Sequence, residues 1–222
     1  MARFYRCLAT VVLMNAGLFV TAYAQFVDGQ AAVGVLGQPD FISKASGVSA
    51  SALNGPNGVA VDPTTGKLFV VDRANHRILR WNSSAALNNG SAAEAVFGQL
   101  DFTSNASGLA ANKFNTPIGI HVDAAGRMWV GDFSNNRVLR FDDASNKASG
   151  ADADAVLGQP DFITGSSGTT AAKMSGPVGL YLDKSGRLWV SNFGAHRVLR
   201  FDNAASKANG ADADAFSVRR IL

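Results

Sequence analysis

The sequence predicts an all-β fold in which a unit of four antiparallel strands occurs about three times. Three observations lead to this prediction. A motif of the form Gly-Gln-x-Asp-Phe begins at residues 37, 98 and 158. Two other motifs, Gly-x-x-x-Asp and x-Arg-x-Leu-Arg followed by an aromatic residue, recur in the same order at a spacing of about 60 residues. The apolar residues of the expected strands form runs such as Leu68–Val71, which is typical of sheets buried on both faces.

Each unit is predicted to contain four short strands, described here for the first unit. The first strand is Gly58–Asp62, and the turn Asp62–Gly66 follows, in which Asp caps its own backbone and Gly supplies a positive φ angle. The second strand is Lys67–Val71. A tight Asp-x-x-Asn turn leads to the third strand, Arg77–Trp81, and a loop rich in small and polar residues leads to the fourth, Ala95–Gly98. A long polar loop then connects to the next unit.

Sheets with apolar groups on both faces need a neighbour on each side. Four-stranded units stacked face to face around an axis, as in a β-propeller, provide this burial. A β-sandwich is an alternative, but it does not require near-identical repeats. The sequence therefore favours propeller blades at about residues 56–99, 117–159 and 176–215. Because closed propellers have at least four blades, a partial or open propeller is expected.

The motifs resemble a known repeat family. Pro-x-Gly-Val-Ala-Val-Asp, Gly-x-Leu-x-Val-x-Asp and Asn-His-Arg-Ile/Val are similar to the NHL repeat, and Val-Leu-Gly-Gln-Pro-Asp-Phe is similar to its long variety in exported bacterial proteins. The resemblance covers residues 32–215 and implies a propeller, commonly of six blades. It does not imply one function, because similar domains include protein- and RNA-binding scaffolds, extracellular sensors and a class of metal-dependent lyases. The fourth-strand motif before Phe41 has no preceding blade in this sequence.

Residues 1–24 are predicted to be a secretory signal peptide. Arg3 and Arg6 form a basic start, Leu8–Val20 is almost entirely apolar, and Ala22–Ala24 has the A-x-A form of a cleavage site. Cleavage after Ala24 predicts a secreted or extracytoplasmic protein without membrane insertion. The single cysteine, Cys7, leaves with the signal peptide, so no disulfide is expected.

The charge balance of the mature chain argues against a nucleic-acid partner. The sequence has 20 basic and 17 acidic residues, and removing Arg3 and Arg6 leaves 18 basic against the same 17. A nearly neutral chain lacks the basic excess that attracts nucleic acid. The recurrent arginines are therefore interpreted as partners of recurrent acids rather than as a basic binding rim. The arginines are Arg77, Arg80, Arg137, Arg140, Arg197 and Arg200, and the acids include Asp72, Asp132, Asp142 and Asp202.

Titratable residues give little indication of catalysis. His121 and Tyr181 stand at equivalent places in the first strands of two blades, and these strands line a propeller channel, so both are candidates for facing a ligand. Because a zinc site usually needs three protein ligands, His121 is interpreted as structural. His76 and His196 are replaced by Asn136 in the middle unit, which indicates a hydrogen-bonding turn position. No catalytic residue, metal or cofactor is predicted.

The repeat is broken at the tip of the turn between the second and third strands. Arg73, Phe133 and Phe193 occupy this position in the three units. Aromatic side chains exposed there would suit a sugar or a peptide, whereas the structural alternative is that each Phe packs beneath the neighbouring long loop.

The leading functional hypothesis is a secreted or surface-exposed binding or scaffold module that recognises an extracellular protein or carbohydrate. One alternative is a metal-dependent propeller enzyme of the lyase or lactonase type that uses His121, and another is an inactive fragment of a longer propeller. An open set of blades also leaves blade edges uncovered, so self-association is expected.

The end of the sequence departs from the repeat. Residues 211–215 repeat residues 151–155, but Phe216–Leu222 replaces the expected Val-Leu-Gly-Gln-Pro-Asp-Phe. Six of these seven residues correspond to the missing motif read in a shifted frame. A reading-frame slip that truncates the propeller is therefore predicted, and the alternative is a natural terminal cap.

Overall fold

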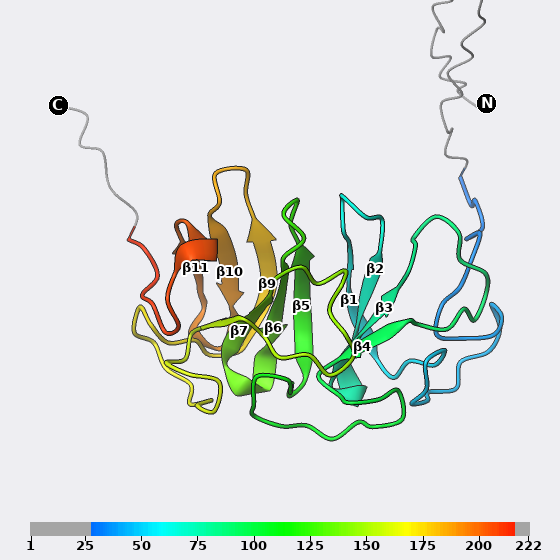
Figure 1. The fold of residues 1–222 in the computed structure, drawn as a ribbon, viewed down its shortest axis with the longest axis horizontal. Coiled ribbons are helices and arrows are strands. Elements are labelled where there is room, and N and C mark those ends of the chain that lie inside the picture. The colour runs from blue at the N-terminus through cyan, green and yellow to red at the C-terminus, as the bar shows by residue number, and fades with distance from the viewer. Residues whose placement is uncertain (1–27, 216–222) are drawn as a thin grey trace, which may run out of the picture. The chain divides into compact units, whose positions relative to one another are not determined.

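The computed structural model describes residues 28–215 of the chain (Figure 1). The predicted signal peptide, residues 1–24, and the predicted frame-shifted segment, residues 216–222, lie outside the described residues. Within residues 28–215 no helix is long and apolar enough to cross a membrane.

The described chain is all-β, as predicted, and its strands form three antiparallel sheets (Figure 1). Blade 1 is the sheet of β1 (Pro56–Val61), β2 (Leu68–Asp72), β3 (Arg77–Trp81) and β4 (Ala95–Phe97). Blade 2 is the sheet of β5 (Pro117–Val122), β6 (Met128–Asp132), β7 (Arg137–Phe141) and β8 (Ala155–Leu157). Blade 3 is the sheet of β9 (Pro177–Leu182), β10 (Leu188–Asn192) and β11 (Arg197–Phe201).

Short 3₁₀ helices replace three of the predicted turns. They are η1 (Arg73–Asn75), η2 (Phe133–Asn135) and η3 (Phe193–Ala195), and a fourth, η4 (Ala204–Ser206), follows β11. Each of the first three ends on a residue in the left-handed region, at φ angles of 52°, 55° and 50° for His76, Asn136 and His196. Left-handed backbone favours Gly and Asn over most residues, so this position reverses the chain between the second and third strands of a blade.

Several details differ from the sequence prediction. β2 is Leu68–Asp72 rather than Lys67–Val71, and β4 ends at Phe97 rather than Gly98. The first strand of blade 1 begins at Pro56 rather than Gly58, because Pro56 pairs with Asp72 across an irregularity in the ladder. Within the described residues blade 3 has three strands rather than four. In blade 2 the fourth strand begins at Ala155, and the equivalent residue in blade 3 is Ala215, where the described chain ends.

Apolar cores fill the spaces between neighbouring blades, as the two-sided apolar strands predict. One core joins Phe69, Val71 and Ile78 of blade 1 to Val130 and Phe141 of blade 2. A second core joins residues of blade 2, such as Trp129, to residues of blade 3, such as Leu188 and Phe201. The first strands of the blades, β1, β5 and β9, contact one another in sequence order. These features define a partial β-propeller of three blades.

Candidate functional site

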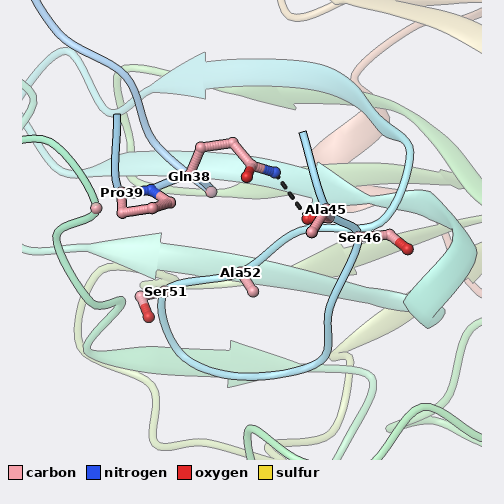
Figure 2. A pocket seen from close by; sticks show the side chains of 8 residues that line it. Gln38, Pro39, Ala45, Ser46, Ser51 and Ala52 are labelled. Atoms are coloured by element: carbon pink, nitrogen blue, oxygen red, sulfur yellow. Dashed lines mark hydrogen bonds between the residues drawn. The ribbon is translucent and has the colours of Figure 1, made fainter. Parts of the chain in front are cut away.

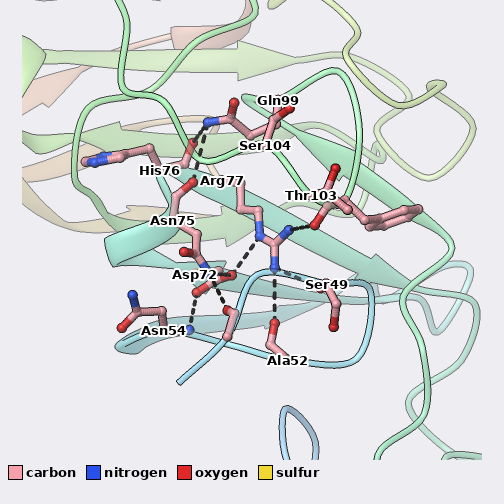
Figure 3. Close-up of polar contacts among 12 residues, drawn as sticks. Ser49, Ala52, Asn54, Asp72, Asn75, His76, Arg77, Gln99, Thr103 and Ser104 are labelled. Carbon is pink, nitrogen blue, oxygen red and sulfur yellow. Dashed lines mark hydrogen bonds and ion pairs between the residues drawn. The ribbon is translucent and has the colours of Figure 1, made fainter. Parts of the chain in front are cut away.

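The turn between the second and third strands is held by a buried polar network (Figure 3). Asp72 and Arg77 are both fully buried, and the Arg77 Nε donates to Asp72 Oδ2 at 2.7 Å. The guanidinium also donates to the carbonyl oxygens of Phe102, Ser49 and Ala52. The network therefore fastens two long loops to the turn, and these loops share one end of the blade with the turn tip.

The network recurs in blade 2 and is altered in blade 3. Arg137 Nε donates to Asp132 Oδ2 at 2.8 Å. Burial raises the pKa of Asp132 to about 6, and the Arg137 guanidinium opposes that rise. In blade 3 the acid is replaced by Asn192, and Arg197 donates instead to the carbonyl oxygens of Thr169, Thr170 and Lys173.

The predicted structural role of the recurrent arginines is confirmed in most repeats. Arg140 pairs with Asp142 at 2.9 Å and Arg200 pairs with Asp202 at 2.8 Å. Arg80 pairs with Glu94 at 2.7 Å, an acid that the repeat pattern did not indicate. These arginines are held at the blades and do not form an uncompensated basic rim.

The residue that ends each of the first two turns, η1 and η2, accepts a hydrogen bond from the next blade. His76 Nδ1 accepts from the backbone N–H of Thr116 at 2.9 Å, and Asn136 Oδ1 accepts from that of Gly176 at 3.0 Å. The interpretation of this position as a hydrogen-bonding site is confirmed, and it explains why Asn replaces His there. Burial lowers the pKa of His76, which keeps the ring neutral and able to accept.

The turn tips carry the side chains that break the repeat. Phe193 is 67% exposed, and its ring centroid lies 6.4 Å from that of the half-buried Phe133. Phe133 packs against Gly176 of the next loop, where a Cβ atom would come within 2.7 Å of the ring. Phe133 thus follows the structural alternative, whereas most of the Phe193 side chain is exposed. Arg73 is exposed at the equivalent tip, one blade before Phe133.

His121 and Tyr181 form a separate pair on β5 and β9. Their ring centroids are 5.6 Å apart, in an edge-to-face arrangement at 72°. Burial lowers the pKa of His121, and the nearby Asp123 charge opposes this. His121 is paired with Trp129, whereas β5 meets the turn end of β6 at Pro117. Four residues of strand correspond to roughly 13 Å, so this pair and the Phe133–Phe193 pair do not form one site.

The acids that close the first strands cap turns, as predicted. Asp62 Oδ1 accepts from the backbone N–H of Thr64 at 2.8 Å, and Asp183 Oδ1 accepts from that of Ser185 at 2.9 Å. Asp123 also accepts from Arg127 Nε at 2.8 Å and from Trp129 Nε1 at 3.2 Å. Among residues 28–215, no three His, Cys, Asp or Glu side chains gather closely enough to hold a metal ion.

A cavity that the sequence did not predict lies beside Gln38 (Figure 2). Its volume is about 380 Å³. The Gln38 Nε2 donates to the Ala45 carbonyl at 2.9 Å. One sequence signal does mark this place: Ala52 stands where the later repeats have Lys113 and Lys173, and both lysines donate to the glutamine equivalent to Gln38. The lining residues are Gly37, Gln38, Pro39, Ala45, Ser46, Ser51, Ala52 and Gly90.

The sheets and their buried turn networks define a repeat protein of the propeller class. Residues 53–81 and 174–201 match the family model of the NHL repeat. These segments cover the first three strands of blades 1 and 3, with the turn tips Arg73 and Phe193 inside them. The chain therefore contains segments that match the NHL repeat, as its motifs predicted.

Comparison with solved structures found distant similarities. The chain is similar to hydrazine synthase of Kuenenia stuttgartiensis, with 12% identity, a TM-score of 0.44, and coverage of 70% of this chain and 34% of that chain. It is also similar to a luciferin-regenerating enzyme, with 15% identity, a TM-score of 0.40, and coverage of 74% and 45%. The chain spans less than half the length of either protein. No curated protein gave a significant match.

Proposed function

We propose that the chain is an exported binding module that recognises an extracellular protein through its turn tips, which we name the tip surface: Arg73, Phe133 and Phe193. The observation that supports this proposal is a contrast, within each turn, between the residues that fasten it and the residue at its tip. In blades 1 and 2 the Asp and Arg side chains that fasten the turn are identical and fully buried, while the tip residues at its solvent end differ. Such a rigid frame presents a variable side chain at a fixed place.

The chemistry of the tip surface favours a protein ligand. Aromatic residues and Arg are enriched at protein interfaces and supply much of their binding energy. Phe193 offers an exposed aromatic ring beside a second ring, and Arg73 offers an exposed guanidinium on the same end of the blades. A carbohydrate site would be expected to add polar side chains that converge on hydroxyl groups.

A peptide-display selection on the purified full chain tests this proposal. Peptides that bind the chain are then measured against Phe193→Ala and Arg73→Ala. Because truncating a central aromatic or Arg side chain typically costs 1–2 kcal/mol or more, we expect affinity to fall at least about tenfold. Lys184→Ala is the matched control for Arg73→Ala, since Lys184 is an exposed basic residue in the turn at the opposite end of a blade.

Three results would count against the proposal. Selected peptides that bind Phe193→Ala and Arg73→Ala as well as the unaltered chain would place recognition elsewhere. Binding of oligosaccharides such as chitohexaose, lost in Phe193→Ala, would replace the protein ligand by a carbohydrate. Stoichiometric metal in the purified chain, together with an activity lost on chelation, would favour the enzyme alternative.

A further inference from the structure

We propose that the cavity beside Gln38 binds a primary alkylammonium group, that is, an ammonium head on an unbranched aliphatic chain. The group would occupy the place that a lysine side chain of the protein itself occupies in the two later repeats. None of the tip-surface residues lines the cavity, so this proposal goes beyond the proposed function and does not depend on it.

In the two later repeats a lysine ammonium is held by the glutamine of the Gly-Gln-x-Asp-Phe motif. Lys113 Nζ donates to Gln99 Oε1 at 3.1 Å. Lys173 Nζ donates to Gln159 Oε1, also at 3.1 Å, and to Ser166 Oγ at 3.0 Å. The amide oxygen of this glutamine is therefore an acceptor for an ammonium group in both repeats that supply one.

The first repeat has the same amide without its ammonium, because Ala52 stands at the position of the two lysines. The Gln38 Nε2 donates to the Ala45 carbonyl at 2.9 Å. The Gln99 Nε2 donates to the equivalent carbonyl, that of Ala106, also at 2.9 Å. Since both amides are fixed through Nε2 to the same carbonyl of the repeat, Oε1 is the atom left to accept from an ammonium. No described residue donates a hydrogen bond to Gln38 Oε1.

The aliphatic part of the lysine side chain also leaves its space unfilled in the first repeat. A Cβ atom added to Gly108 would lie 2.9 Å from Lys113 Cγ, and Lys173 packs over its own glycine in the same way. Added to the equivalent Gly47, the Cβ atom would meet only Ala52 Cβ within 4 Å among the described residues. Ala52 ends at Cβ, so the place of three methylene carbons and an ammonium nitrogen is open.

The cavity lies where these atoms are missing (Figure 2). Gln38 and Ala52 both line it, and its volume of about 380 Å³ has room for the missing atoms and for a ligand chain that continues outward. This volume is also within the usual range for small-molecule sites. Pro39, Ser46 and Ser51 line the cavity and are exposed, so it opens to solvent.

Asp40 supplies a negative charge near the ammonium position. In the third repeat, hydrogen bonding by Thr164 lowers the pKa of the equivalent Asp161, and the nearby Lys173 ammonium lowers it further. Hydrogen bonds from Ser43 lower the pKa of Asp40, so its carboxylate is charged at neutral pH. A cation bound in the cavity would therefore meet a carboxylate, as Lys173 does.

The missing atoms define the ligand class. An ammonium group has three N–H donors, so it can donate to Gln38 Oε1 and to a lining serine hydroxyl at the same time. Beyond Cβ, a lysine side chain consists of three methylene carbons and one nitrogen, which are the non-hydrogen atoms of n-propylammonium. Lys44 is the lysine of this loop, and it is exposed.

An NMR titration of the purified full chain with n-propylammonium, followed through the side-chain amide signal of Gln38, tests the site. We expect saturable shifts centred on Gln38, Ala45 and Ala52, with a dissociation constant of about 1–10 mM, since a ligand of so few atoms binds weakly. 1-Propanol has no charge and tetramethylammonium has no N–H donor, so each should bind at least about tenfold more weakly.

Two variants assign the binding to the cavity. Ala52→Lys supplies the missing side chain and should abolish binding while the chain still folds, since the later repeats have lysine at this position. Gln38→Met keeps the length of the side chain but removes the acceptor, so the affinity should fall at least about tenfold. Lys44→Ala is the matched control and should bind as the unaltered chain does, because Lys44 is an exposed basic residue of the same loop.

A second ligand distinguishes the source of the amine, because a free small amine and a lysine side chain of another protein offer the same head and chain. Nα-acetyllysine methylamide is therefore compared with n-propylammonium. Equal or higher affinity for the lysine derivative would assign the group to a protein ligand, and lower affinity would assign it to a free amine. Phe193→Ala should leave both affinities unchanged, so a failure of this proposal is separate from a failure of the proposed function.

Four results would overturn the proposal. The first is no saturable shift up to about 100 mM n-propylammonium. The second is equal binding by Ala52→Lys, and the third is equal affinity for tetramethylammonium. The fourth is binding that occurs only in Lys44→Ala, since it would mean that Lys44 itself fills the cavity.

Discussion

At the scale of single residues, the buried Asp–Arg pairs show how one side chain organises several segments. Arg77 uses three of its nitrogens to hold Asp72 and three carbonyl oxygens from two loops. An arginine buried in this way is stable only while its charge is compensated and its donors are satisfied. The Arg77 side chain therefore links the turn to both loops, and Asp72 is the anion that compensates its charge.

Removing the negative charge of Asp72 should lower the stability of the folded chain. Asp72→Asn leaves the Arg77 charge buried without an anion, so we expect the free energy of unfolding to fall by about 3 kcal/mol. Urea denaturation followed by circular dichroism measures the change. Asp142→Asn is the control, because the Asp142 side chain is 44% exposed and its pair with Arg140 should contribute less than about 1 kcal/mol. Equal losses in both variants would contradict this assignment.

The histidine at the end of the first turn should make stability depend on pH. Burial lowers the pKa of His76 below its ordinary value of 6.5, so the unfolded chain binds this proton more readily than the folded chain. Its contribution to stability is therefore fully present above pH 6.5 and is lost as pH falls through the folded-state pKa.

His76→Asn, the residue that blade 2 uses naturally, should reduce this pH dependence while keeping an acceptor for Thr116. Denaturation midpoints measured between pH 7.5 and about 5 give the comparison, and the titrations of His121 and Asp132 cancel because both forms contain them. An unchanged slope in the variant would mean that His76 does not titrate in this range.

At the scale of elements, the blades are joined by close contact between their first strands. A Cβ atom on Gly119 of β5 would lie only 1.8 Å from the Val178 carbonyl oxygen of β9. The Val178 carbonyl oxygen belongs to the backbone, and the position of a Cβ atom is fixed by its own backbone, so neither can rotate away. The innermost strands can approach in this way only because the residue at this position is glycine.

Gly119→Ala should therefore separate blades 2 and 3 and lower the free energy of unfolding by about 2 kcal/mol or more. Gly179→Ala is the matched control, because the same position in blade 3 faces only the Ser191 side chain among the described residues. The free energy of unfolding should fall by less than half as much in Gly179→Ala as in Gly119→Ala when thermal unfolding of both variants is measured. A larger loss in Gly179→Ala would reverse the argument.

Most of these elements could be predicted from the sequence because the repeat supplies three versions of each. The third strand was predicted with its observed bounds, Arg77–Trp81, since the motif and the apolar run end together. The first strand was predicted as Gly58–Asp62, which begins two residues late and ends one residue late, because a proline pairing across an irregular ladder leaves no periodic signal.

The candidate site was predicted less completely. Positions that vary between repeats identified Arg73, Phe133 and Phe193, but they did not show that Phe133 packs on Gly176 while Phe193 is open. That difference depends on which blade follows, and a sequence motif carries no information on it. The cavity beside Gln38 was also missed, although Ala52, in place of Lys113 and Lys173 of the later repeats, marks its position.

At the scale of the whole molecule, export remains a prediction that one measurement checks. If the full coding sequence is expressed in a secreting bacterial host, we expect the chain in the extracytoplasmic fraction with Gln25 as its first residue, because Ala22–Ala24 forms the cleavage site. Amino-terminal sequencing and intact mass give the result. A chain retained in the cytoplasm with Met1 in place would contradict both the signal peptide and the proposed extracellular partner.

The joint between blades has a consequence for how such arrays change over evolutionary time. The joint between blades 1 and 2 and the joint between blades 2 and 3 carry the same lysine and glutamine at the same offsets, so a recombination event that duplicates or removes one of these units would leave the remaining joint intact. Tandem duplication of the gene segment would thus lengthen the array by complete blades without a compensating substitution. The number of blades in such arrays can therefore change by whole blades, while the residue at each turn tip can be substituted independently of the others.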